Sequence, residues 1–250
     1  MTKVDDLRAA FRQAPDPEAF IRERSGLPGP RANLELAAAV AEEGDERLFR
    51  RLLRWGPDRA PANTPEEFLS FCGTVGLGSL LARGRTDVLP VLRALAADPR
   101  WRTREAVALA LQRWGRVDMD GLLAEMRAWA GGSRFEQRAA VAALCEPDLL
   151  RTPRHARRVL ALLDRITRSV PGARDRGEEG FRALRQALGY GWSVAVAALP
   201  EEGLPRLERW MASDDPDVRW AMRENLKKRR LAAVAGRRLD RWRELVGSAR

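Results

Sequence analysis

The chain repeats one pattern of polar and apolar positions four times. Each copy begins with a short polar turn, continues with an apolar or aromatic residue, and runs on as a helix that carries basic residues. The four copies are "ADPRWRTREAVALAL" from Ala97, "GGSRFEQRAAVAAL" from Gly131, "GEEGFRALRQALGYGW" from Gly177 and "SDDPDVRWAMRENL" from Ser213. Their anchor residues, Trp101, Phe135, Phe181 and Val218, lie 34, 46 and 37 residues apart. This spacing predicts a series of two-helix repeats.

The segments between these copies supply the other helix of each repeat. They are "TDVLPVLRALA", "MDGLLAEMRAWA", "PRHARRVLALLDRITRSV" and "GLPRLERWMA", and each ends where Asp-Pro, Gly-Gly or Ser-Asp begins. In repeats of the HEAT or armadillo kind, the first helix faces outward, the second lines a concave surface, and each unit buries its apolar face on its neighbours. We therefore predict an all-α fold, an α-solenoid of HEAT-like two-helix repeats.

The solenoid is expected to include the whole chain. Helices at about residues 4–13, 17–24, 31–43, 45–55 and 65–83 continue the stack towards the N-terminus, with a loop from Gly56. We predict a single α-solenoid over residues 1–250, with weakly repetitive helices in 1–84, the HEAT-like repeats in 85–230 and a basic C-terminal helix in 231–250.

The composition supports helices and leaves little for metal chemistry. Ala, Leu, Arg and Glu dominate, and Ile21 and Ile166 are the only isoleucines. Cys72 and Cys145 have no CxxC spacing and His155 is the single histidine, so we expect reduced, buried thiols, no metal and no cofactor. No apolar stretch approaches the roughly 20 residues that span a bilayer, and the first residues are acidic. We expect a cytoplasmic monomer with no membrane partner.

The net charge of +10 is concentrated in two blocks. Residues 219–250 hold 11 Lys and Arg against 3 Asp and Glu, and residues 151–176 hold 8 against 2. The rest of the chain is therefore slightly acidic. Charge gathered in this way indicates an anionic partner.

The first block contains the end of a predicted helix over residues 213–231. At about 100° per residue, one arc is apolar and a second, about 80° wide, is cationic. The cationic arc consists of Arg219, Arg223, Lys227 and Arg230. These side chains either contact phosphates or another polyanion, or they only complement the helix dipole at its C-terminal end.

The second block places Arg154, Arg158 and Arg165 at helical spacing beside an apolar face. Two interpretations remain open for it. It is either the solvated side of an outward helix or part of a surface that follows a nucleic-acid backbone.

Eight tryptophans accompany a single tyrosine. Trp101, Trp129 and Trp210 are predicted to pack between helices, whereas Trp192 and Trp220 lie on or near the second helices and are candidates for stacking on bases. Gly73, Gly76 and Gly78 match no phosphate-binding loop, so we predict that they let two helices approach closely.

The repeat spacing, together with "RWGRVDMDGLL", "FRALRQALGYGWSVAV" and "DDPDVRWAMRENLKKRR", resembles the HEAT-like-repeat DNA alkylation repair superfamily, the AlkD-like alkylpurine DNA glycosylases. The likeness covers roughly residues 85–230. It implies a basic concave face that holds duplex DNA, and an Asp that stabilises positive charge on the sugar as an alkylated base leaves. In this sequence Trp114 and Asp118 match the Trp-x-x-x-Asp spacing, Arg138 matches an arginine of a concave helix, and Tyr190 takes a later aromatic position. Asp118 also suits the N-cap of the following helix.

These observations leave three functions open. The first is a HEAT-like nucleic-acid-binding protein that binds duplex DNA in connection with alkylation damage, through the cations above together with Arg138, Trp114, Tyr190 and Trp192. The second is an active alkylpurine DNA glycosylase in which Asp118 is the catalytic carboxylate. The third is a scaffold whose basic face binds an acidic protein partner.

Overall fold

The computed structural model describes residues 3–247, and side chains as far as residue 245. Within this range all regular structure is helical, with fifteen α-helices and two short 3-10 turns. The all-α prediction is therefore confirmed. Contacts group the chain into two compact units, residues 1–117 (unit 1) and 118–250 (unit 2), which are described one by one. The continuous solenoid over residues 1–250 stays a prediction, and the end of its last helix, residues 248–250, lies outside the described residues.

Unit 1 is built around one long, almost entirely buried helix. Its helices are α1 (Lys3–Arg12), α2 (Pro17–Glu23), α3 (Leu34–Glu43), α4 (Glu46–Leu52), α5 (Pro65–Ala82), the turn η1 (Thr86–Val88), α6 (Leu89–Leu95) and α7 (Trp101–Gly115). The central helix α5 packs most extensively on α7, and also on α3 and α4. Asp45 and Thr64 cap α4 and α5 by accepting backbone N–H groups. The five helices predicted before residue 84 are all present, with ends shifted by up to three residues.

The three glycines of α5 allow this close packing. A Cβ atom at Gly76 would lie 2.2 Å from the Phe49 ring, and one at Gly78 would lie 2.5 Å from the carbonyl oxygen of Ala110. A Cβ atom at Gly73 would lie 2.9 Å from the carbonyl oxygen of Phe49. The prediction that these glycines let helices approach closely is confirmed.

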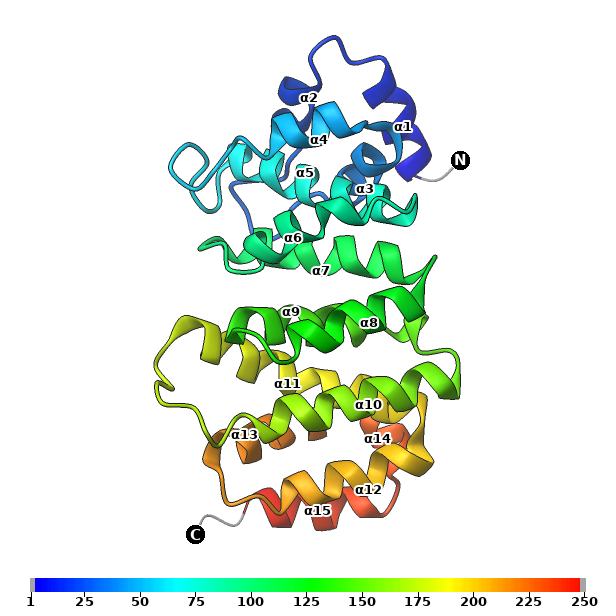
Figure 1. Cartoon of the computed structure of the whole chain (residues 1–250), viewed down its shortest axis with the longest axis vertical. Helices are drawn as coiled ribbons and strands as arrows, with labels where there is room; N and C mark the ends of the chain where they lie inside the picture. The colour runs from blue at the N-terminus through cyan, green and yellow to red at the C-terminus, as the bar shows by residue number, and fades with distance from the viewer. Residues whose placement is uncertain (1–2, 248–250) are drawn as a thin grey trace. The chain divides into compact units, whose positions relative to one another are not determined.

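Unit 2 consists of helix pairs in two rows. Its helices are α8 (Met119–Trp129), α9 (Arg134–Leu144), α10 (Pro153–Arg168), α11 (Glu179–Ala198), α12 (Pro200–Met211), α13 (Pro216–Leu226), α14 (Arg229–Ala235) and α15 (Arg238–Gly247), with the turn η2 (Pro147–Leu149) between α9 and α10. We call α8, α10 and α12 the first row, and α9, α11 and α13 the second row. Figure 1 shows the first row in front of the second. Helices of the second row pack on one another more extensively than those of the first.

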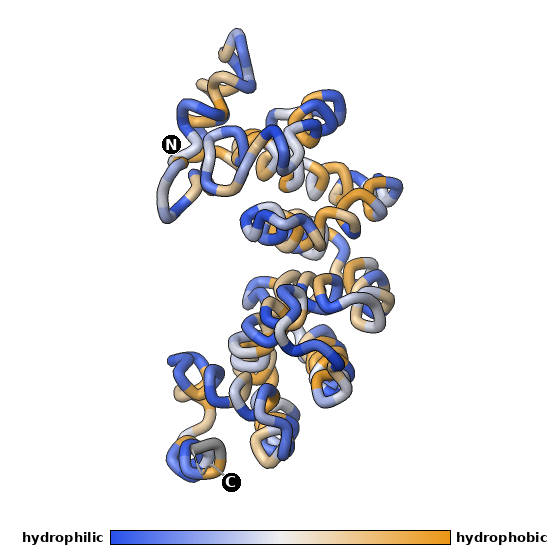
Figure 2. Tube along the Cα trace, turned by 90° about the vertical axis from the view of Figure 1, so that its left-hand side faces the viewer, coloured by the Kyte–Doolittle hydropathy of each residue, from blue (hydrophilic) through white to orange (hydrophobic). Residues whose placement is uncertain are grey.

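The apolar side chains of unit 2 fill the space between the rows. Figure 2 shows hydrophobic positions mainly where helices face other helices. Trp129 and Trp192 are fully buried, and the indole N–H of Trp192 donates to Thr167 Oγ1 of α10 at 3.0 Å. Gly191 brings α11 against Val141 and Cys145 of α9. The packing of paired helices is consistent with an α-solenoid.

The helix predicted over residues 213–231 is interrupted. Helix α13 ends at Leu226, Lys228 has an extended backbone, and α14 begins at Arg229. The reason is the burial of Leu231, whose side chain is 0% exposed. In an unbroken helix Leu231 would point in a direction about 140° from that of Val218, on the solvent side, whereas the break turns it into the core. Arg230 therefore does not continue the cationic arc of Arg219 and Arg223.

Two other expectations concern buried side chains. Cys72 and Cys145 are free and buried, as predicted. Burial raises the pKa of Cys145 to about 12, partly opposed by the positive charge of Arg230. Trp101 was expected to pack between helices, but it is 50% exposed because it is the first residue of α7 and projects beyond the packed part of the helix. Trp129 and Trp210 are packed as predicted, and the Trp210 indole donates to Asp164 at 2.8 Å.

No helix in residues 3–247 combines the length and the apolar character needed to cross a bilayer. Over the same residues, no three His, Cys, Asp or Glu side chains gather in a way that could hold a metal ion.

Candidate nucleic-acid interface

A cationic surface runs across the second row of unit 2. The residues of α11 that stay exposed or half-buried recur every three or four positions, opposite the side that packs on α10 and α12. We call the accessible residues of α9, α11 and α13 together the second-row surface. It carries Arg138, Arg182, Gln186, Tyr190, Arg219, Arg223 and Lys227.

Two of the three helices that carry this surface, α11 and α13, are joined by side-chain hydrogen bonds. Arg185 of α11 donates to Asp217 of α13 at 2.6 Å, and Asn225 donates to the carbonyl of Leu188 at 2.8 Å while accepting the Ser193 N–H at 2.7 Å. Because Asn225 is fully buried, its hydrogen bonds to α11 are protected from water. The exposed side chains therefore project from a rigid layer.

Two cations of the second-row surface are available to a ligand. Arg182 and Arg223 are exposed, and neither forms an ion pair with another described residue. Lys227 pairs with Glu224 at 2.5 Å. Trp220 is half-buried and its ring is covered by the guanidinium of Arg185, 4.3 Å from the ring centre. This contact occupies one face of the ring that was predicted to stack on bases.

A second group of cations follows on α14 and α15, which pack on α11 and α13. We call it the C-terminal cluster, and it consists of Lys228, Arg229, Arg230, Arg237 and Arg238. Four of the five are exposed and Lys228 is half-buried, and none pairs with a carboxylate among the residues that the structure describes. The influence of Arg230 on Cys145 places this arginine near the C-terminal end of α9. The cluster thus adjoins the helices of the second row.

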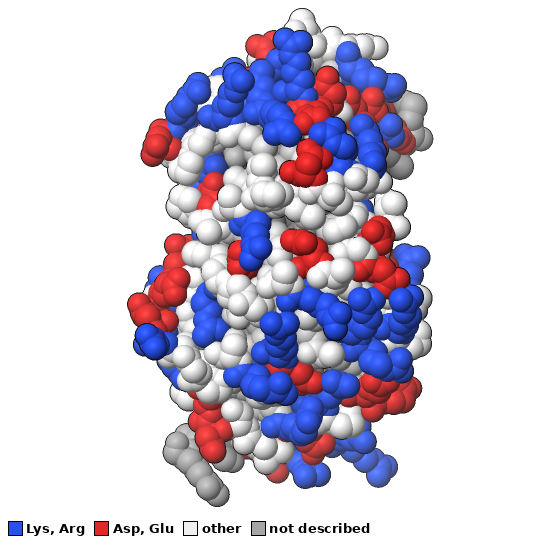
Figure 3. Space-filling view, in the orientation of Figure 1, with Lys and Arg blue, Asp and Glu red and all other residues white. Residues whose placement is uncertain are grey.

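The first row of unit 2 is also rich in arginine, and several of these arginines pair with carboxylates. Figure 3 shows this face, with blue arginines and red carboxylates intermingled. Arg154 pairs with Asp120 at 3.1 Å and Arg157 with Glu202 at 2.6 Å, while Arg158 also binds Asp120. Arg165 donates to the carbonyl of Arg127 at 3.2 Å. Both interpretations of α10, the solvated side of an outward helix and part of a surface that follows a nucleic-acid backbone, stay predictions.

The residues carried over from the resemblance belong to different helices and to both units. Trp114 lies in α7 of unit 1 and is 5% exposed, whereas Asp118 begins unit 2. Tyr190 is half-buried on the second-row surface, where Arg138 also lies. Trp192 is 0% exposed, so its prediction as a base-stacking residue is wrong: a side chain at this position of α11 fills the space between the rows.

Asp118 caps helix α8. Its Oδ1 accepts the backbone N–H of Gly121 at 2.8 Å, which confirms the N-cap interpretation. A catalytic role for the same carboxylate stays a prediction. The two roles can be separated, because asparagine caps helices about as well as aspartate but carries no charge.

We expect Asp118→Ala to lower the free energy of unfolding by about 1 kcal/mol, and Asp118→Asn to change it by only a few tenths. Urea denaturation of the three proteins measures this difference, and equal losses in both variants would contradict a capping role.

If the protein releases methylated purines from duplex DNA, Asp118→Asn is expected to slow that release at least about tenfold.

Sequence reasoning overlooked several residues of these surfaces. Arg182 was not selected, although its spacing from Gln186 and Tyr190 follows the exposed side of α11. The charge block of residues 219–250 contained Arg237 and Arg238, but nothing in the pattern showed which of its members lack carboxylate partners. Ion pairing between distant residues leaves no signal in local spacing.

Comparisons of this chain with protein-family models, curated proteins and solved structures find no match. The described residues form an all-α protein of packed helix pairs, and unit 2 carries exposed cations without carboxylate partners.

Proposed function

We propose that this chain is a nucleic-acid-binding protein in which the second-row surface and the C-terminal cluster contact the phosphates of duplex DNA. One observation carries the proposal. Seven cations of the second-row surface and the C-terminal cluster, namely Arg182, Arg223 and the five members of the cluster, form no ion pair with a described carboxylate. Uncompensated cations held on a rigid layer are suited to a ligand with closely spaced negative charges.

The distribution of charge favours the second row over the first as the phosphate-binding surface. On the first row, Asp120, Asp164 and Glu202 lie among the arginines, and each accepts an ion pair. A phosphate backbone on that face would have to displace or approach these carboxylates, which repel it. On the second row Arg182 and Arg223 pair with no described carboxylate and are available to a phosphate.

An acidic segment of a protein partner is the competing ligand for the same surface. The two ligands differ in how binding depends on salt. Duplex DNA releases condensed counterions when cations neutralise its phosphates, so the logarithm of its affinity falls steeply and linearly with the logarithm of salt concentration. Binding that is independent of base sequence is expected too, because phosphate contacts carry no sequence information.

The test compares two pairs of substitutions. Arg182→Ala with Arg223→Ala is expected to weaken binding to unrelated DNA duplexes and to reduce the salt slope by about two phosphate contacts. The matched control, Arg154→Ala with Arg157→Ala on the first row, removes the same charge and should change the slope less. Fluorescence anisotropy at several salt concentrations measures both. Unchanged binding and slope in a folded Arg182/Arg223 variant would reject the second-row surface as the DNA site.

A further inference from the structure

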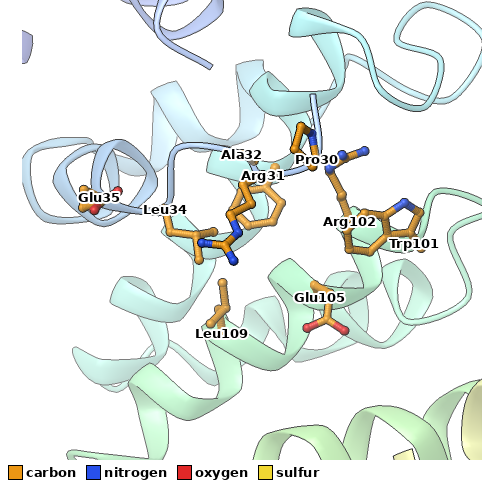
Figure 4. A pocket seen from close by; sticks show the side chains of 10 residues that line it. Pro30, Arg31, Ala32, Leu34, Glu35, Trp101, Arg102, Glu105 and Leu109 are labelled. Atoms are coloured by element: carbon orange, nitrogen blue, oxygen red, sulfur yellow. The ribbon is translucent and has the colours of Figure 1, made fainter. Parts of the chain in front are cut away.

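Unit 1 contains a pocket that none of the functions above uses. Its volume is about 450 Å³, and it lies between the segment that begins α3, the central helix α5 and the first half of α7 (Figure 4). Phe71, 2% exposed, comes from α5, while Trp101, Glu105 and Leu109 are spaced by four residues along one side of α7. A pocket of this volume accommodates a small organic ligand.

The walls of this pocket expose apolar surface to water. Leu34 is 53% exposed and Trp101 is 50% exposed, and both line it. Single exposed apolar residues are common on protein surfaces, but two large ones converging on one pocket mark a site where a ligand removes them from water. The indole of Trp101 offers a flat surface to that ligand.

The polar groups of the pocket leave one cation available. Arg102 is buried and already bonded within the protein, because it donates to the Gly29 carbonyl at 2.8 Å and to Glu67 at 3.3 Å. Its guanidinium also lies 4.5 Å from the centre of the Trp101 ring. Glu35 pairs with Lys3 at 3.6 Å. Arg31 is exposed and has no ion-pair partner in the described part of the chain, and Figure 4 shows its side chain among the pocket residues.

We propose that this pocket binds a nucleotide unit, with its planar base stacked on Trp101 and its phosphate held by Arg31. The apolar walls suit a ring, and the single uncommitted cation suits an anionic group attached to it. Arg102 stacks on the same indole and fixes its orientation, so the ring is positioned before the ligand arrives. Where the nucleotide belongs to a DNA strand, the inference rests on the proposed function; a free nucleotide needs no such assumption.

The experiment uses 2-aminopurine, a fluorescent base whose emission falls when it stacks on an aromatic ring. Two probes distinguish the sources of the nucleotide: 2-aminopurine ribonucleoside 5′-monophosphate, and a short single-stranded oligonucleotide with one internal 2-aminopurine. Saturable quenching of either probe by the full chain is expected. Quenching of the free nucleotide identifies a mononucleotide site, and quenching of the oligonucleotide alone identifies a nucleotide within a strand.

Variants assign the signal to the pocket. Trp101→Ala is expected to weaken binding about tenfold or more and Trp101→Phe to restore most of it, because phenylalanine keeps a stacking face. Arg31→Gln should weaken binding several-fold, while Arg83→Gln, an exposed arginine outside the pocket, should not. Circular dichroism checks that each variant is folded. Absence of quenching with both probes, or quenching that is indifferent to Trp101→Ala, overturns the proposal.

The duplex measurement separates this inference from the proposed function. If Arg182→Ala with Arg223→Ala abolishes duplex binding while neither probe is quenched, the proposed function stands and the pocket inference fails. If duplex DNA does not bind but the free nucleotide is quenched in a Trp101-dependent manner, the pocket inference stands without the proposed function.

Discussion

Replacing Arg100 by methionine is expected to lower the free energy of unfolding by about 3–5 kcal/mol. Arg100 is 3% exposed, and its guanidinium holds both oxygens of Asp98 at 2.9 and 2.8 Å. It also donates to the carbonyl of Trp55 at 2.9 Å, to that of Ala60 at 3.2 Å and to Ser70 Oγ at 3.2 Å. Arg100→Met removes the counter-charge of the buried Asp98 carboxylate, which keeps only the backbone N–H of residue 100 at 2.8 Å, and takes the side-chain donor away from the other acceptors. Leaving a buried charge uncompensated is the costly part of breaking a buried ion pair.

Urea denaturation of two further variants shows whether the lost charge pair is the cause. Asp98→Asn combined with Arg100→Met removes both charges and should lose less stability than Arg100→Met alone. Arg83→Met, at an exposed position of the same unit, should change stability by no more than about 0.5 kcal/mol. A loss under about 1 kcal/mol in Arg100→Met would contradict a structural role for the Asp98–Arg100 pair.

Neutralising the C-terminal cluster is expected to have the largest effect on DNA binding. Changing Lys228, Arg229, Arg237 and Arg238 to glutamine removes four cations that have no carboxylate partner among the described residues. If each contacts a phosphate, affinity for duplex DNA at low salt should fall about 10²–10³-fold and the salt slope should decrease by about four contacts. Stability should change little, because three of these side chains are exposed and only Lys228 is half-buried.

The matched control neutralises four arginines of the first row, Arg154, Arg157, Arg158 and Arg165. It removes the same formal charge, but three of these side chains already pair with Asp120 or Glu202. A smaller loss of affinity is therefore expected. Equal losses in the two quadruple variants would show that net charge alone governs binding and that the site assignment is wrong.

Much of the helical architecture follows from local sequence. The Asp, Thr and Ser residues that precede helices accept backbone N–H groups, as Asp118, Thr64 and Ser133 do. The anchors Phe135, Phe181 and Val218 start helices of the second row, because a polar turn followed by an amphipathic segment is itself a helix start signal. The close approach at Gly76 and Gly78 was also predictable, because glycine weakens a helix and its missing side chain leaves room for a neighbouring one.

The sequence by itself therefore determined the helical class, the pairing of helices and most helix ends, because these depend on residues close together in the chain. Only the tertiary structure decided which side chains are accessible. Burial of Leu231 breaks the helix that carries Arg223, packing between the rows hides Trp192, and the start of α7 exposes Trp101. The tertiary structure also decided which arginines have a carboxylate partner. Arg157 forms an ion pair with Glu202, 45 residues away, whereas Arg182 pairs with no described carboxylate. Burial and ion pairing depend on contacts between distant residues, which local periodicity does not encode.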